Sequence, residues 1–355
     1  MNIDGAVLDR YTAGAQARQD ALCCPVDYDS SLLAILPREI IERDYGCGDP
    51  SRYVRTGDIV LDLGSGAGKI CYMAAQLVGS RGRVIGIDMN DDMLALACKY
   101  QSAMAARLGG DRVKFLKGKI QDLALDIRAM QDWLAENPVQ GEHDRIRLGQ
   151  REEQQKATRP LIPDNSIDLV ISNCVLNLVA DSEKQQMVSE VFRVLKPGGR
   201  IAISDIISDR PVPADMKQDP ELWSGCLSGA FHEAEMPAMF AAAGFSAITY
   251  DRWEVQPWRI VNGITFRSVT LTAVRPAVAN DGDDCHELVY RGPFESVTDE
   301  TGRCYRRGER IAVTAERHRL LTGPVYNGAF IDLSTADETS SACCPSESAS
   351  GGCCG

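Results

Sequence analysis

Cysteine is the residue type in this chain with the widest chemical capacity, and it is abundant. The 355 residues include 13 cysteines and only 4 histidines. In a reducing compartment such a number favours metal, metalloid or redox chemistry over a disulfide framework. Any single cysteine can also be a small core residue. Four cysteines lie within the motifs described below: Cys47, Cys71, Cys174 and Cys226.

A glycine-rich turn marks a candidate cofactor site. The run Asp62-Leu63-Gly64-Ser65-Gly66-Ala67-Gly68 stands between an apolar segment typical of a strand and an apolar segment typical of a helix. Nucleotide-binding loops have this context, because glycine lets a ligand approach the backbone closely. The spacing differs from the GxGxxG pattern, which places a pyrophosphate on a helix N-terminus.

A ligand with an ammonium group fits this turn better than a dinucleotide. The carboxylate of Asp62 would repel a phosphate but would attract the amino group of S-adenosylmethionine. The carboxylate of that cofactor can accept hydrogen bonds from the backbone N–H groups of Gly64, Ser65 and Gly66. We therefore expect S-adenosylmethionine at this turn.

Further positions complete the predicted cofactor site. Asp88, which is followed by Met89, ends the second strand-like segment, where a carboxylate is expected to bind the ribose. Ile120 follows the third such segment, on the expected adenine side, and Asn173 ends the fourth and is expected to face the methionine moiety. Two alternatives stay open, namely a site for NAD and a turn that serves only packing.

Four cysteine motifs together resemble the arsenite methyltransferase family. They are DYGCGDP at Cys47, GSGAGKICY at Cys71, SNCVLNLV at Cys174 and LWSGCLSGA at Cys226. The resemblance covers roughly residues 25–330 and implies an enzyme that methylates arsenite and methylated trivalent arsenicals. It further implies that Cys174 and Cys226, together with Cys47, bind trivalent arsenic. Cys47 and Cys71 would take part in a redox cycle.

Thiolates suit this substrate on chemical grounds. Trivalent arsenic is soft and thiophilic, so two or three cysteines are its natural protein ligands. Its lone pair can attack the methyl group of the cofactor, and we therefore expect no general base. Positioning would then carry the catalysis, and it contributes about 7–11 kcal/mol in well-oriented systems. Because Cys71 lies at the start of a helix, we expect its pKa to be lowered.

Repeated methylation needs a source of electrons, because each transfer raises arsenic to the pentavalent state. Two thiols that close to a disulfide supply two electrons, and we expect thioredoxin or glutathione to restore the thiols. Adjacent cysteines form three further pairs, and we hypothesise that these capture arsenic: Cys23-Cys24, Cys343-Cys344 and Cys353-Cys354. The alternative is that low-complexity segments tolerate them.

Strand and helix patterns alternate along the part of the chain that carries these motifs. Apolar segments typical of buried strands begin near Asp58, Arg83, Val113, Ile167 and Arg200. Helices are expected after the glycine turn, from Asn90, and over 182–195 with Asp181 or Ser182 as the cap. The alternation predicts an α/β protein with a class I methyltransferase-like Rossmann fold, whose mostly parallel sheet is covered on both faces.

Composition divides the chain into five expected segments. Residues 1–55 form a helical N-terminal segment, 56–208 the S-adenosylmethionine-binding domain, and 209–275 an arsenic-binding cover with the end of the sheet. Residues 276–333 form a small β-rich C-terminal domain. The Cys-containing tail, 334–355, has too few apolar residues to fold.

Charge and hydropathy exclude two classes of partner. The formal net charge of -12 leaves no basic surface of the kind that nucleic acids need. No apolar run approaches the roughly 18 residues of a membrane span, and the N-terminus has no signal-like segment. We therefore expect a cytoplasmic protein without membrane contact, and we expect it to be a monomer.

Two other functions remain open at the level of sequence. A methyltransferase for a carbon or oxygen acceptor, such as a quinone or a sterol, would share the cofactor site but need an apolar acceptor cavity and usually a base. A protein that only sequesters metalloids would have no use for the motif from Asp62 to Asp88. Structural zinc is disfavoured, because the chain contains no C-x-x-C pair.

Overall fold

The computed structural model describes most of the chain. The described residues are 3–17, 19, 26–276, 285–299, 302–326 and 328–333. The three pairs of adjacent cysteines and the expected tail lie outside them. Among the described helices, none is long and apolar enough to cross a membrane.

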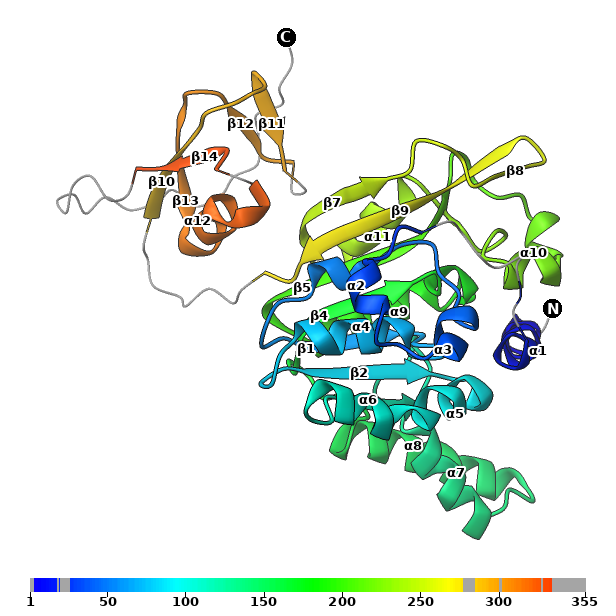
Figure 1. Cartoon of the computed structure of the whole chain (residues 1–355). Helices are drawn as coiled ribbons and strands as arrows, with labels where there is room; N and C mark the ends of the chain where they lie inside the picture. The colour runs from blue at the N-terminus through cyan, green and yellow to red at the C-terminus, as the bar shows by residue number, and fades with distance from the viewer. Residues whose placement is uncertain are drawn as a thin grey trace.

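A mixed β-sheet forms the centre of the molecule (Figure 1). Its main path has the order β3-β2-β1-β4-β5-β9-β7, with β6 beside β5 and β8 beside β9. The pairs from β3 to β5 are parallel, whereas β9 is antiparallel to β5, β7 and β8. The strands are β1 (Ile59–Leu63), β2 (Arg83–Asp88), β3 (Val113–Lys117), β4 (Ile167–Asn173), β5 (Leu195–Ser208), β6 (Phe231–His232), β7 (Ser246–Trp253), β8 (Arg259–Val261) and β9 (Ile264–Val274).

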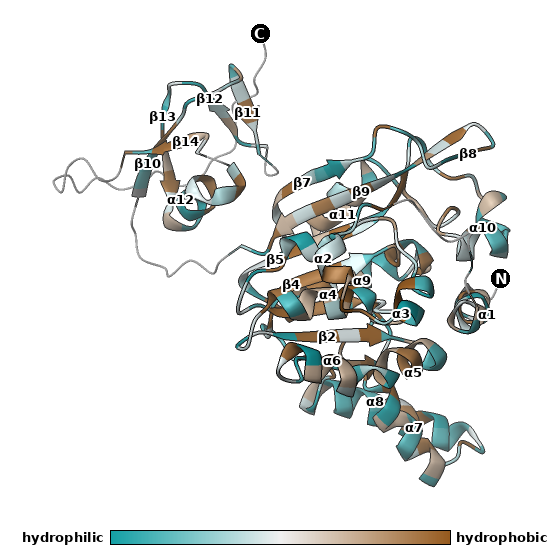
Figure 2. Cartoon of the chain, in the orientation of Figure 1, coloured by the Kyte–Doolittle hydropathy of each residue, from teal (hydrophilic) through white to brown (hydrophobic). Residues whose placement is uncertain are grey.

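Apolar residues on both faces of the central strands explain the sheet. Alternate side chains of a strand point to opposite faces, so Leu61 and Val170 pack on one face while Val60 and Ile171 pack on the other. Figure 2 shows apolar residues along β2 and β4 and a hydrophilic outer surface on helix α8 (Glu142–Thr158). Continuous apolar runs of this kind are typical of parallel strands that are buried on both faces.

Helices cover the two faces and the carboxyl edge of the sheet. Helices α9 and α11 pack with one apolar cluster, and α3 and α4 pack with the other. The helices of this part are α1 (Ile3–Gln16), α2 (Ser30–Leu33), α3 (Arg38–Glu42), α4 (Lys69–Leu77), α5 (Asp91–Lys99), α6 (Gln101–Leu108), α7 (Ile127–Glu136), α8, α9 (Lys184–Val194), α10 (Pro220–Ser224) and α11 (Glu235–Ala242), with short 3-10 helices η2 (Pro50–Tyr53), η3 (Leu176–Leu178) and η4 (Met216–Gln218).

The predicted fold class is confirmed, with one local error. The expected cap of α9 is wrong, because the helix begins after Glu183 without a side-chain cap bond. Asp181 instead forms ion pairs with Lys184 and Lys217. Residues 126–160 contain α7 and α8.

The C-terminal region is a separate small structure with its own apolar cluster. Three antiparallel strands pair in the order β13-β10-β14, and β11 pairs with β12. The predicted β-rich character is therefore confirmed, although the region also contains a helix that the sequence analysis missed. Its elements are β10 (Cys285–Tyr290), β11 (Ser296–Thr298), β12 (Cys304–Arg306), β13 (Arg310–Thr314), α12 (Ala315–Thr322), η5 (Pro324–Tyr326) and β14 (Phe330–Asp332).

Strand order directs ligands to the carboxyl edge between β1 and β4. The connection from β1 leads to β2 and β3 on one side of the sheet, whereas the connection from β4 leads to β5 on the other side. Open α/β sheets bind ligands at such a point. Helix α1 contacts α5 and α10, so it lies across the same edge (Figure 1).

Asn90 joins α1 to the sheet domain, and we predict that its loss destabilises the protein. Its Oδ1 accepts hydrogen bonds from the N–H groups of Asp92 and Met93, capping α5, while its Nδ2 donates to Leu8 and Thr12 of α1. Asn90→Ala should lower the free energy of unfolding by about 1–3 kcal/mol in urea titrations.

The control for this prediction is Asp91→Asn in the same first turn of α5. Asp91 is largely exposed and pairs with Lys117, so its loss should cost less than about 1 kcal/mol. An equal loss of stability in the two variants would contradict the role given to Asn90.

Candidate active site

Glycines shape the turn after β1. Gly64, Gly66 and Gly68 all have positive φ, in the left-handed region that favours glycine. A Cβ at Gly64 would lie 2.5 Å from the side chain of Val175, so a larger residue does not fit. At Gly66 the nearest heavy atom to such a Cβ is 3.9 Å away, which leaves the backbone open to a ligand.

Asp88 holds this turn in place. Its Oδ2 accepts a hydrogen bond from the N–H of Gly66 at 2.8 Å, and its Oδ1 accepts one from Asn90 at 2.9 Å. The N–H of Ser65 donates to the carbonyl of Ile87 at 2.9 Å. Two of the three N–H groups expected to receive a cofactor carboxylate are therefore already used within the protein.

A pocket opens beside the turn, with an empty volume of about 860 Å³ that includes space open to solvent. It lies at the ends of β1, β2 and β4 and under α1. Six of the eight residues predicted for the cofactor line it: Gly64, Gly66, Asp88, Met89, Ile120 and Asn173. Asp62 and Ser65 are not among the lining residues.

The expected contact of Asp62 with the cofactor's ammonium group is not supported by its position. Alternation along β1 directs Asp62 to the face covered by α4, where the thiol of Cys71 donates a hydrogen bond to its Oδ2 at 3.2 Å. Burial raises the pKa of this carboxyl to about 8. The buried hydroxyl of Ser65 has no hydrogen-bond partner within the described residues.

A different carboxylate, that of Asp44, lines the pocket. Asp44 accepts a hydrogen bond from the N–H of Lys69 at 3.0 Å and forms a buried ion pair with its Nζ at 3.3 Å. Sequence reasoning missed both residues. Their positions in the sequence could have indicated them, because Asp44 begins the DYGCGDP motif and Lys69 directly follows the glycine turn.

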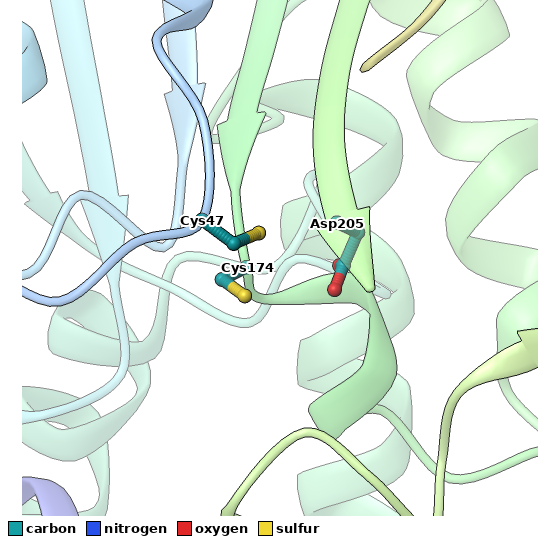
Figure 3. A group of neighbouring side chains, drawn as sticks. All are labelled: Cys47, Cys174 and Asp205. Atoms are coloured by element: carbon teal, nitrogen blue, oxygen red, sulfur yellow. The ribbon is translucent and has the colours of Figure 1, made fainter. Parts of the chain in front are cut away.

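Two of the four predicted cysteines meet at the carboxyl edge of the sheet, next to an aspartate. The sulfurs of Cys47 and Cys174 and a carboxylate oxygen of Asp205 lie within 4.8 Å of one another (Figure 3). Cys47 comes from the segment before η2, Cys174 follows β4, and Asp205 belongs to β5. All three are buried.

Cys226 joins this group from the covering segment after α10. Its thiol donates a hydrogen bond to the backbone carbonyl of Cys174 at 3.4 Å. Cys47, Cys174 and Cys226 belong to one apolar cluster that includes Trp223 and Ile206. Cys174 also lines the pocket beside the glycine turn. Three thiols from distant parts of the chain thus share one buried environment next to the pocket.

Cys71 occupies a different environment. It lies on α4 in the apolar cluster of the opposite sheet face, fully buried and bonded to Asp62. Burial, followed by the nearby charge of Asp62, raises the pKa of its thiol well above the usual value. The predicted lowering of this pKa by the helix N-terminus is therefore wrong, and Cys71 does not line the pocket.

Cys174 and Cys226 are two of the five described residues other than glycine that have positive φ. Cys174 has a φ of 64° and Cys226 a φ of 62°, both in the left-handed region. That conformation costs a residue with a Cβ roughly 1–2 kcal/mol. Strain of this kind persists only where surrounding contacts enforce it, and it is frequent at functional sites.

Asn173 holds the Cys47 segment against the sheet. Its Oδ1 accepts hydrogen bonds from the N–H groups of Cys47 at 2.9 Å and Gly48 at 3.0 Å. A Cβ at Gly46 would lie 2.1 Å from its Nδ2, so the segment packs directly on the amide. Asn173 was predicted to face the methionine moiety, and it lines the pocket while it also positions a cysteine.

Two residues beside the thiols were missed by the sequence analysis. Asp205 is fully buried, and burial raises its pKa to about 6 even though backbone N–H groups bond to its carboxylate. The sequence could have indicated Asp205, because it lies in a predicted strand near the carboxyl edge of the sheet. The hydroxyl of Tyr11, on α1, lies 4.0 Å from the sulfur of Cys226, and burial raises its pKa.

Comparisons with known proteins identify the family of this chain. Residues 55–132 and 143–244 match a family described as a methyltransferase domain, and residues 279–351 match a domain of unknown function. An arsenite methyltransferase of Aquipseudomonas alcaligenes is 30% identical over 83% of this chain and 74% of that protein. One of Halobacterium salinarum is 36% identical over 57% of this chain, and the match spans only 41% of that protein.

A solved structure shows the same architecture. The arsenic(III) S-adenosylmethionine methyltransferase of Chlamydomonas reinhardtii is 26% identical, with a TM-score of 0.58, and the match covers 87% of this chain and 96% of that one. The methyltransferase-domain match and this shared architecture identify the chain as an S-adenosylmethionine-dependent methyltransferase. The chain belongs to the arsenite methyltransferase family, as the extended match to the Aquipseudomonas protein establishes.

Burial of Asp62 predicts a specific pH dependence of stability. Its pKa of about 8 in the folded protein exceeds its ordinary value of 3.8, so between these values the folded state keeps a proton that the unfolded chain releases. Stability should therefore fall as pH rises through this range, by at most about 1.4 kcal/mol per pH unit from this group. In Asp62→Asn the urea midpoint should fall less steeply with rising pH between pH 5 and 8 than in the wild type.

Asp29→Asn is the matched control for this measurement. Asp29 is exposed, and hydrogen bonds from Ser31 lower its pKa below 3.8, outside the measured range. The control should keep the slope of the wild-type protein. An unchanged slope in Asp62→Asn would show that its carboxyl does not titrate as described.

Proposed function

We propose that this protein transfers methyl groups from S-adenosylmethionine to trivalent arsenic bound by Cys47, Cys174 and Cys226. The observation that carries the proposal is the convergence of these thiols in one buried cluster, with Cys174 on the wall of the cofactor pocket. Membership of the arsenite methyltransferase family supports the same substrate. Arsenite and methylated trivalent arsenicals are then the acceptors.

The pocket fits the proposed cofactor in its shape and charge. The space beside Gly66 is open, although its N–H already donates to Asp88, and Asp44 and Asp88 place carboxylates on the wall. The cofactor would be held by these residues with Met89 and Ile120. When bound, S-adenosylmethionine supplies an electrophilic methyl group on a positively charged sulfur. Buried carboxylates favour such a cation, because their charge acts through a medium of low dielectric constant.

The three thiols bind and orient the substrate. Soft trivalent arsenic prefers thiolate ligands, and each thiol loses its proton to a departing hydroxide of arsenite, which leaves as water. Left-handed backbone at Cys174 and Cys226 fixes where the two sulfurs lie. The remaining lone pair of arsenic is then available to the methyl group. Proximity and orientation of this kind contribute about 7–11 kcal/mol in well-oriented systems.

We further propose that two thiols of the protein return the product to the trivalent state. Two cysteine thiolates bound to arsenic would break their As–S bonds, leave two electrons on arsenic and join as a disulfide. Thioredoxin or glutathione would reopen this disulfide by thiol exchange, supplying two electrons and two protons. The proximity of Cys47 and Cys174 supports this step. Cys71 stays a candidate for the redox cycle, although its raised pKa disfavours it as an attacking thiolate.

Detoxification of arsenic in the cytoplasm is the biological role that we propose. Support comes from the reduced thiols that the reaction needs, since a reducing compartment maintains them. We propose that the monomer is active, because every thiol of the candidate site comes from a single chain. A carbon or oxygen acceptor such as a quinone or a sterol is not favoured, since it would have no use for three converging thiols.

The proposal is tested by incubating the protein with arsenite, S-adenosylmethionine and a dithiol. The arsenic species are then separated and measured. The wild-type protein should form methylated arsenic. Cys174→Ser and Cys226→Ser should lower the rate at least about 100-fold for arsenite and for a methylated trivalent substrate, because each removes a ligand. Cys47→Ser and Cys71→Ser should retain methylation of the methylated substrate.

Cys98→Ser provides the control, because this cysteine is exposed on α5 and lies outside the cluster. Its rate should equal that of the wild type. Full activity of Cys174→Ser or Cys226→Ser would contradict thiolate binding of the substrate. Absence of any methylated arsenic with the wild-type protein would overturn the proposed function itself.

A further inference from the structure

The turns that carry Cys174 and Cys226 meet through a buried side chain that has no role in the proposed chemistry. Both cysteines have left-handed backbone conformations, which side chains with a Cβ rarely adopt. The other described residues with positive φ, glycines aside, are Ala247, Asn165 and Asn262, and only the two asparagines are of a type that tolerates that region more readily. The backbone at the two cysteines therefore needs contacts that enforce it.

Asp205 and β5 hold the first turn. The N–H of Cys174 donates to the carbonyl of Ser204 at 2.8 Å. The carboxylate of Asp205 then accepts hydrogen bonds from the N–H groups of Leu176 at 2.9 Å and Asn177 at 3.4 Å. The turn after Cys174 is thus fixed to the end of β5 by a carboxylate and a backbone carbonyl.

Asn177 links this turn to the second one. Its Nδ2 donates to the carbonyl of Ile206 at 2.6 Å and to the carbonyl of Cys226 at 3.4 Å. The side chain is completely buried, and a Cβ at Gly229 would lie 1.9 Å from the backbone oxygen of Asn177. The chain after Cys226 therefore packs directly on Asn177.

When Cys226 loses its thiol proton, the hydrogen bond from Asn177 to Cys226 becomes a larger part of what joins the two turns. In the thiol form, Cys226 donates a hydrogen bond to the carbonyl of Cys174 at 3.4 Å. A thiolate that binds arsenic has no proton to donate, so this bond between the turns disappears. The amide of Asn177 remains, together with the indole N–H of Trp223, which donates to Leu178 at 3.2 Å.

We propose that Asn177 is a positioning residue that sets the separation of the Cys174 and Cys226 sulfurs for binding of trivalent arsenic. The inference rests on the proposed function, since it assigns a geometric role within the same site. Asn177 does not line the pocket, so its loss should affect arsenite more than S-adenosylmethionine. This difference separates positioning of the thiols from general support of the fold.

Asn177→Leu tests the proposal with a side chain of similar shape that cannot donate. Initial methylation rates would be measured over a range of arsenite and then of S-adenosylmethionine concentrations. The variant loses the hydrogen bonds to Ile206 and to Cys226, and only the second joins the two turns. We expect the KM for arsenite to rise about tenfold, as for loss of that one buried hydrogen bond. The KM for S-adenosylmethionine should change less than about twofold, and kcat less than about threefold.

Ser228→Ala is the matched control from the same covering segment. Ser228 is fully buried, and its hydroxyl donates to the carbonyl of Met216 at 2.7 Å, but it does not join the two cysteine turns. Its KM for arsenite should equal that of the wild type. An equal rise in both variants, or an unchanged KM for arsenite in Asn177→Leu, would overturn the proposal.

Two further outcomes are distinguishable. If Asn177→Leu does not fold, Asn177→Ser replaces it, since serine keeps one donor in a smaller side chain. Its KM for arsenite should rise at least about threefold, and a wild-type value would overturn the inference. If the wild-type protein forms no methylated arsenic, the proposed function fails and the inference fails with it. If the wild-type protein is active and the Asn177 variants keep its KM for arsenite, the inference is refuted while the proposed function stands.

Discussion

Thiols from distant segments meet at the carboxyl edge of the parallel part of the sheet. The strands, turns and covering helices around this edge hold them there. The sulfurs of Cys47 and Cys174 and a carboxylate oxygen of Asp205 lie within 4.8 Å of one another. The thiol of Cys226 donates a hydrogen bond to the carbonyl of Cys174. Cysteine side chains are short, so the backbone itself must come close. The price is left-handed backbone at two cysteines, which hydrogen bonds from buried neighbours enforce.

Buried carboxylates surround the same edge and give it an unusual electrostatic character. The pKa of each of Asp44, Asp62, Asp88 and Asp205 is raised, with burial as the largest cause. Lys69 neutralises Asp44 only. A cationic sulfonium bound nearby would relieve part of this cost, since opposite charges attract strongly where water is excluded. The charge of the cofactor and the burial of these acids are therefore complementary.

Strand positions and the fold class could be predicted, because apolar periodicity and glycine turns are local properties. Asn90 caps α5 as its position suggested. The α9 cap could not be predicted, since tertiary ion pairs of Asp181 with two lysines compete with capping. Helix α12 was missed because its polar sequence is stabilised by packing on β10, β13 and β14 rather than by its own pattern.

The sequence by itself determined which chemistry is available, because the glycine turn and four cysteine motifs are contiguous patterns. Tertiary structure alone decided how those residues are used. The two-residue period of β1 turns Asp62 away from the pocket and onto Cys71, while Asp44 takes a place on the wall. The roles of Asp205 and Asn177 depend on contacts between remote segments. Burial, which no local pattern measures, reversed the expected shift in the pKa of Cys71.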